Sequence, residues 1–260
     1  MAELLSDAVV VITGVGPGLG TTLARRCADE GANLVLVART AARIEELARD
    51  IIASGGRALA VPTDITIESD VENLVQATTA TYGRVDALIN NAFLHPSMKP
   101  FSGTDFSHLR DSLELTVLGA LRTTQAFTPA LAQSGGSIVN LSSMVIRHSD
   151  PTYGPYKLAK SALLAMSQSL ASELGPLGVR VNSVAPGYIW GQVLKDYFAQ
   201  QARDAGCSID DVYNAAAAGS DLKRLVTEDD VASAILFFIS EMASGITGQT
   251  LDVNCGEYKS

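Results

Sequence analysis

Three side chains have the types and spacing of a proton-transfer site: Ser143, Tyr156 and Lys160. Tyr156 and Lys160 are four residues apart in YKLAKSALLAMSQSLASEL, whose apolar residues recur with helical spacing. Residues four apart share one helix face, so the phenol and the ammonium are expected to lie together. A free tyrosine has a pKa of about 10, and a neighbouring cation lowers that value. Ser143 ends the run SIVNLSS, where its hydroxyl could bond a substrate oxygen. Taken alone, the Tyr–Lys spacing also fits an ordinary surface pair.

A glycine-rich segment near the N-terminus has the pattern of a phosphate-binding turn. The segment TGVGPGLG follows the apolar run VVVIT and leads directly into a helical pattern. Glycines let the backbone approach a phosphate closely, and the helix start offers free N–H groups. Because the turn opens a strand–helix–strand unit, it predicts a dinucleotide, the alternative being an empty turn. The predicted contacts are Gly14, Gly16, Gly18, Leu19 and Gly20.

The next apolar run ends without the acidic residue typical of NAD-binding proteins. Its last residues are Val37, Ala38, Arg39 and Thr40. The Arg39 guanidinium is placed to bind a 2′-phosphate, and the helix beginning at Thr40 adds N–H groups. The sequence therefore favours NADP(H), with NAD(H) possible and an exposed surface arginine as the structural alternative.

The elements that must position these residues alternate along the chain. Short apolar runs, rich in Val, Ile and Leu, are separated by amphipathic helical patterns, which is typical of strands buried on both faces. The sequence predicts an α/β fold over 1–260, a Rossmann-like doubly wound parallel sheet of about seven strands in a single domain. The runs are 9–13, 33–38, 58–64, 87–92, 137–143 and 179–187.

Several polar residues are placed to begin helices. Thr40 is expected to cap one helix, Thr66 or Ser69 the next, and Thr227 forms a capping box with Asp230. The stretch 188–222 breaks the alternation. Because ligands of such sheets bind beyond the carboxyl ends of the strands, this stretch is a candidate substrate lid.

Composition excludes several function classes. The net charge of −9 disfavours nucleic acid and acidic membrane surfaces as partners. Three cysteines and three scattered histidines fit neither a disulfide framework nor a metal site. The N-terminus lacks a basic signal-peptide region, and the apolar run AILFFIS is far shorter than the ~20 residues of a membrane span. We expect a cytoplasmic protein without a metal, and neither a nucleophile elbow nor an NTPase loop is present.

The motifs together resemble the short-chain dehydrogenase/reductase family over nearly the whole chain. Besides the turn and the Ser–Tyr–Lys set, the match includes Asp64-Ile65, Asn90-Asn91-Ala92, Pro186-Gly187 and TGQTLDV. The resemblance implies an oxidoreductase that interconverts a ketone and a secondary alcohol by hydride transfer with NAD(P)(H). It also implies a homotetramer.

Residue roles follow from this resemblance. Tyr156 would be the general acid/base, Ser143 would orient the carbonyl, and Lys160 would bind the nicotinamide ribose. Lys160 and an oxidised nicotinamide ring would together lower the pKa of Tyr156. The remaining implied contacts are Asp64 with Ile65 at the adenine, Asn91 and Ala92 at the adenosine ribose, and the Ile189 backbone at the carboxamide.

Some positions depart from the family pattern. Thr116 stands where the family has an Asn that helps to hold a water in the proton relay. Phe93 and Cys255 replace glycines, Ala159 replaces a serine, and Gly191 replaces a threonine. The Ser–Tyr–Lys set itself is intact.

Apolar residues near the expected site predict the substrate class. They suggest a small apolar ketone or secondary alcohol, unless several of them pack the lid onto the body. A steroid or 3-oxoacyl thioester, a non-catalytic dinucleotide sensor and a lyase or dehalogenase on this scaffold are the alternatives. The residues are Tyr188, Trp190, Val193, Leu194, Tyr197 and Phe198 of the lid, with Phe93, Leu94, Met144 and Val145.

Overall fold

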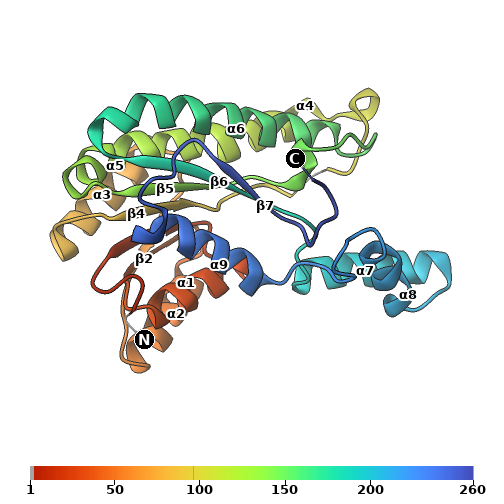
Figure 1. Ribbon diagram of the computed structural model, residues 1–260, viewed down its shortest axis with the longest axis horizontal. Coiled ribbons are helices and arrows are strands. Elements are labelled where there is room, and N and C mark those ends of the chain that lie inside the picture. The colour runs from red at the N-terminus through yellow and green to blue at the C-terminus, as the bar shows by residue number, and fades with distance from the viewer. Residues whose placement is uncertain (1–2, 96, 260) are drawn as a thin grey trace.

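The apolar runs form one parallel sheet. The computed structural model describes residues 3–95 and 97–259, and within them seven strands pair in the order β3-β2-β1-β4-β5-β6-β7 (Figure 1). All the pairs are parallel. Strand order reverses between β1 and β4, which confirms the predicted doubly wound Rossmann-like fold. The bounds are β1 Val9–Thr13, β2 Asn33–Ala38, β3 Arg57–Pro62, β4 Ala87–Asn90, β5 Ser137–Leu141, β6 Arg180–Pro186 and β7 Thr250–Val253.

Helices cover both faces of the sheet and bury a core on each. On one face lie α1 Leu19–Asp29, α2 Ala41–Ala53 and α9 Glu228–Ile239 (Figure 1). On the other lie α3 Glu68–Tyr82, α5 Ala120–Ser134 and α6 Gly154–Leu174. Successive strand residues point to opposite faces, so Ile12 joins the first core and Val11 the second.

Shorter helices complete the chain. The helix α4 Phe106–Leu113 runs through a π-helical segment, Glu114–Gly119, into α5. Within the described residues, four 3₁₀ turns lie at 101–103, 144–146, 175–177 and 241–243.

The structure confirms some of the helix-capping residues predicted from the sequence and contradicts others. Thr227 and Asp230 form the predicted capping box, in which the Thr227 hydroxyl accepts from the Asp230 N–H at 3.1 Å. Thr40 occupies the N-cap of α2, but its side chain accepts no capping hydrogen bond from a described residue. Ile67 precedes α3, so neither Thr66 nor Ser69 caps it. Thr66 instead donates its hydroxyl to Asp64 at 2.7 Å, because a short side chain next to a carboxylate bonds locally.

The edge strand β3 differs from the expectation for buried strands. Its residues are half-buried or exposed, whereas every residue of β1 and β5 is buried. β3 pairs only on one side within the described sheet, because it is an edge strand. The apolar residues of the run 58–64 predicted a strand, but they did not predict that this strand lies at the edge of the sheet.

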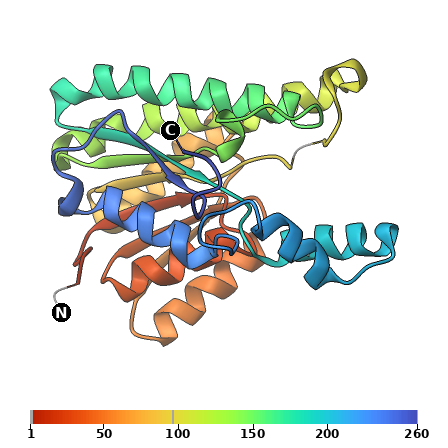
Figure 2. The same cartoon turned by 45° about the vertical axis from the view of Figure 1, so that its right-hand side comes forward.

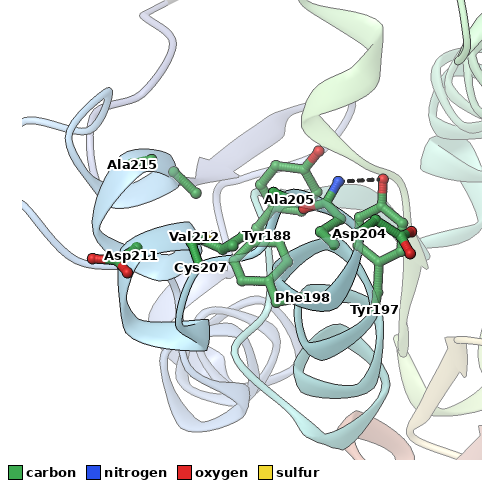
Figure 3. A pocket seen from close by; sticks show the side chains of 11 residues that line it. Tyr188, Tyr197, Phe198, Asp204, Ala205, Cys207, Asp211, Val212 and Ala215 are labelled. Atoms are coloured by element: carbon green, nitrogen blue, oxygen red, sulfur yellow. Dashed lines mark hydrogen bonds between the residues drawn. The ribbon is translucent and has the colours of Figure 1, made fainter.

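The segment 188–222 is mostly helical and projects from the carboxyl ends of the strands (Figure 2). It contains α7 Gln192–Ala205 and α8 Ile209–Ala217, packed around a small core of their own. The Trp190 ring lies 5.7 Å from Phe198 and 4.7 Å from Tyr213, centroid to centroid. A hollow of about 690 Å³ lies between the two helices (Figure 3). Trp190 and Phe198 therefore pack within this segment, whereas the packing alternative expected such residues to pack it onto the body.

None of the described helices has the length and hydropathy needed to cross a membrane. No group of three or more His, Cys, Asp or Glu side chains in the described chain is placed to hold a metal ion. The homotetramer and the cytoplasmic location stay predictions.

Candidate active site

The glycine-rich turn between β1 and α1 has a backbone that only glycine allows. Gly14 has a φ of +70°, and a Cβ added there would lie 2.6 Å from the Ala92 Cα. A Cβ on Gly20 would lie 2.7 Å from the Gly14 carbonyl oxygen. Gly18 has a φ of +93° and precedes the first residue of α1. The turn thus brings bare backbone and a helix N-terminus to one place, which fits a pyrophosphate group.

Asn91 fixes this turn to the sheet. Its side-chain amide donates to the carbonyl oxygens of Thr13, at 3.2 Å, and Gly14, at 2.9 Å. The Thr13 hydroxyl also accepts from the Asn91 N–H at 3.2 Å. Asn91 therefore holds the glycine-rich turn against the sheet, and its expected ribose contact stays a prediction.

A cleft of about 480 Å³ lies over the carboxyl ends of the central strands. It brings together residues that are far apart in the sequence, and it contains most of the expected reacting groups. Site residues predicted from the sequence that line the cleft are Gly18, Leu19, Asn91, Ser143, Tyr156, Lys160 and Ile189. Gly14, Gly16 and Gly20 form the remainder of the turn, whose Gly18 and Leu19 reach the cleft.

The helix α6 presents Tyr156 and Lys160 to this cleft on one face, as their spacing predicts. Lys160 is only 2% exposed, and its Nζ donates to the Leu141 carbonyl oxygen at 2.7 Å. That Nζ lies 5.8 Å from the centroid of the Tyr156 ring and 5.4 Å from that of Phe93. Phe93, which replaces a small family residue, thus covers the ammonium and shields it from water.

Burial sets the pKa values of both groups. Burial raises the pKa of Tyr156 to about 12, and a hydrogen bond with the Ser143 hydroxyl opposes this only in part. Burial lowers the pKa of Lys160 to about 7, because the charged form loses its hydration. The raised pKa of Tyr156 applies to the protein without a dinucleotide, and the lowering expected from Lys160 together with an oxidised nicotinamide ring stays a prediction. Because desolvation raises this pKa, the Tyr156 phenol is neutral at neutral pH in the protein alone.

Arg39 and Asp64, both expected at the adenosine half, lie beyond the cleft, at the ends of β2 and β3. The Arg39 side chain is 70% exposed, and its Nη1 lies 4.0 Å from Asp64 Oδ2. Burial raises the pKa of Asp64, but the Thr66 hydrogen bonds and Arg39 outweigh it, so this pKa is lowered overall. Asp64 is thus an anion at neutral pH, close to a cation that extends into solvent.

Two expected contacts are buried in the second core. Ile65 is 4% exposed, and a Cβ on Gly119 would lie 2.9 Å from its side chain. Thr116 is 2% exposed and lies in the π-helical segment that packs against α6. Such segments often occur at functional sites, but Thr116 does not line the described cleft. Its catalytic role stays a prediction, as do the adenine contact of Ile65 and the ribose contact of Ala92.

Sequence reasoning missed Glu228, the first residue of α9. Glu228 lines the cleft, and its Oε2 accepts from the Thr22 hydroxyl at 2.6 Å. A Cβ on Gly18 would lie 3.2 Å from Glu228 Oε1, and one on Gly191 would collide with it. The carboxylate therefore bridges the phosphate-binding turn and the loop after β6. No local pattern relates positions 22 and 228, although the glycines at 18 and 191 leave the space it fills.

Comparison with known proteins identifies the class. The family profile described as "Enoyl-(Acyl carrier protein) reductase" matches residues 14–257. The chain is 32% identical over 255 residues to the A-factor type gamma-butyrolactone 1'-reductase (1S-forming) of Streptomyces virginiae, with 97% of this chain and 96% of that protein covered. It is 33% identical to the L-fucose dehydrogenase of Oryctolagus cuniculus, with 95% and 84% covered.

A solved structure supports the same class. The crystal structure of L-sorbose reductase from Gluconobacter frateurii, complexed with NADPH and L-sorbose, superimposes with a TM-score of 0.93. The two chains are 28% identical, and each is covered completely. The protein therefore belongs to the short-chain dehydrogenase/reductase family of oxidoreductases, as the sequence predicted.

Proposed function

We propose that this protein uses a nicotinamide dinucleotide, with NADP(H) preferred, to interconvert a small, largely apolar ketone and its secondary alcohol. One observation supports this most: the glycine-rich turn and the side chains of Ser143, Tyr156 and Lys160 border one cleft. When bound, the dinucleotide supplies or accepts the hydride. The similar L-sorbose reductase, in complex with NADPH and a sugar, supports the same class of reaction.

The side chains of this chain supply the proton chemistry. The neutral Tyr156 phenol donates its proton to the carbonyl oxygen during reduction and becomes a phenolate. In the reverse reaction the phenolate accepts the proton of the alcohol. The Ser143 hydroxyl stabilises the charge that develops on that oxygen. Lys160, whose pKa lies at about 7, exchanges a proton readily near neutral pH and is held by the Leu141 carbonyl. The segment 188–222 acts as a lid that excludes water.

The general test is a spectrophotometric screen. The absorbance of the reduced nicotinamide is followed with NADPH and NADH against small ketones, and with NADP⁺ and NAD⁺ against secondary alcohols. The proposal requires turnover that depends on the dinucleotide. Turnover without a dinucleotide would instead favour a lyase.

Arg39→Gln is expected to weaken NADPH binding about 10- to 100-fold and NADH binding less than threefold. A charge-assisted hydrogen bond to a 2′-phosphate stabilises by about 1.5–3 kcal/mol, and NADH lacks that phosphate. Fluorescence titration gives both dissociation constants. Arg25→Gln is the matched control, because Arg25 is also exposed but pairs with Asp50 away from the site. Equal losses for both dinucleotides would refute the 2′-phosphate contact.

Glu228→Gln is expected to tighten dinucleotide binding about three- to tenfold. The carboxylate stands beside the turn that receives two phosphates, and like charges at this range repel even when partly screened. Glutamine keeps an acceptor for the Thr22 hydroxyl while removing the charge. Asp229→Asn is the control, since Asp229 follows Glu228 in α9 but is exposed and accepts from Arg26 of α1. The gain in dinucleotide affinity should become smaller in high salt. An unchanged dinucleotide affinity of Glu228→Gln would contradict the placement of the phosphates at this turn.

A further inference from the structure

Two phenols meet inside the cleft that contains Tyr156. Tyr153 precedes α6, and Tyr188 follows the Pro186-Gly187 pair after β6. Their hydroxyl oxygens are 2.7 Å apart, and both residues line the cleft. The centroid of the Tyr153 ring lies 6.5 Å from that of Tyr156. The pair thus stands a few bond lengths from the oxygen that Tyr156 would protonate.

The surrounding rings fix these two phenols in place. Tyr188 packs edge-to-face on Phe198 at 6.1 Å, and Tyr153 packs edge-to-face on His148 at 6.3 Å. Tyr188 also forms part of the wall between the cleft and the hollow of the lid segment (Figure 3). The hydroxyls are therefore preorganised before any substrate binds, which lowers the entropy lost on binding.

The pair has unused hydrogen-bonding capacity. One hydroxyl donates to the other, and either can be the donor, so one O–H remains available together with free lone pairs. Within the described chain, no other hydrogen bond uses either hydroxyl. Burial raises the pKa of both phenols, so both are neutral at working pH. A neutral donor–acceptor pair matches a hydroxyl or ether oxygen.

Charge around the cleft argues against an ionised substrate. Lys160 and Glu228 are the charged residues among those that line it, histidines aside. The Lys160 ammonium bonds the Leu141 carbonyl, and the Glu228 carboxylate bonds Thr22. A substrate carboxylate or phosphate would lose its hydration without gaining a partner cation. Much of the remaining lining is apolar, including Met144, Val145, Val193 and Leu194.

We infer that the Tyr153–Tyr188 pair is a specificity determinant that binds a neutral oxygen substituent of the ketone, a few bonds from the carbon that is reduced. The inference rests on the proposed function, since it concerns the same cleft. It narrows the substrate class to an uncharged, largely apolar ketone with one hydroxyl or ether group. The pair positions the substrate and takes no part in proton transfer.

The test compares ketones of equal shape. Reduction of 4-hydroxycyclohexanone, 4-methylcyclohexanone and 4-oxocyclohexanecarboxylate is measured with the preferred dinucleotide, and kcat/KM is determined for each. The wild type is expected to prefer the hydroxyketone to the methylketone by tenfold or more, because the methyl group leaves the phenol pair unsatisfied. The carboxylate is expected to be the poorest substrate.

Tyr153→Phe and Tyr188→Phe should each reduce this preference to threefold or less. The methylketone should retain its kcat/KM within about twofold in both variants. The double variant should lose little more than either single variant, because the two hydroxyls act as one unit. Tyr82→Phe is the control, since its hydroxyl donates to the Leu34 carbonyl at the far side of the sheet.

The outcomes distinguish failure of the specificity inference from failure of the proposed reductase function. An unchanged preference in the double variant, equal losses for both ketones, or a preferred carboxylate would each overturn the inference while leaving the reductase proposal standing. If the wild type oxidised neither NADPH nor NADH with any ketone in the broad screen, the proposed function would fail, and the inference with it.

Discussion

Tyr156→Phe is expected to lower kcat by two to four orders of magnitude and to leave the dissociation constant for NADPH within about twofold. The variant keeps the ring that packs in the cleft but removes the O–H that gives its proton to the carbonyl oxygen. Burial holds the pKa of this phenol at about 12 in the protein alone, so the lost group is a neutral acid rather than a phenolate. Stopped-flow single turnovers and equilibrium titration separate the two quantities.

The outcome also decides between the enzyme and the sensor on the same fold. Tyr82→Phe removes a phenol outside the cleft and should keep full activity. If Tyr156→Phe kept normal turnover, another group would be the proton donor. If the wild type bound NADPH tightly but transferred no hydride to any of a broad ketone panel, the protein would be a dinucleotide sensor.

Features encoded over a few residues were predictable from the sequence. The four-residue spacing of Tyr156 and Lys160 fixes one helix face, and the glycines of the turn report a backbone that no Cβ permits. Thr227 and Asp230 form their capping box within one helical turn. Each of these follows from local geometry, which the residue types alone specify.

Features that depend on distant parts of the chain were not predictable in this way. Thr22 and Glu228 are 206 positions apart, and Tyr153 and Tyr188 are 35 apart, so no periodicity relates them. The packing of Trp190 inside the lid segment could not be predicted without knowing how α7 and α8 run. The raised pKa of Tyr156 in the protein alone was not predictable either, because it follows from burial, which the sequence does not reveal.

Lys160→Met is expected to lower kcat/KM at least 100-fold and to change how stability depends on pH. Burial lowers the pKa of Lys160 to about 7 in the folded protein, from 10.5 in the unfolded chain. Between these values the unfolded state binds more protons, so the stability of the wild type rises with pH. The slope from this group approaches about 1.4 kcal/mol per pH unit near pH 8–9 and vanishes well below pH 7.

The difference in the free energy of unfolding between the wild type and Lys160→Met isolates the pH dependence that comes from Lys160. Burial also raises the pKa of Cys27 to about 12, which lowers stability as the pH rises above about 9, but the wild type and the variant share that thiol. Urea unfolding of the dinucleotide-free proteins at pH 6, 7, 8 and 9 should therefore show the wild type gaining on Lys160→Met as the pH rises. Lys157→Met, one turn away on α6 and bonded to the His148 carbonyl, should follow the wild type. Parallel curves for the wild type and Lys160→Met would mean that the ammonium is hydrated, and the shielding by Phe93 would then be wrong.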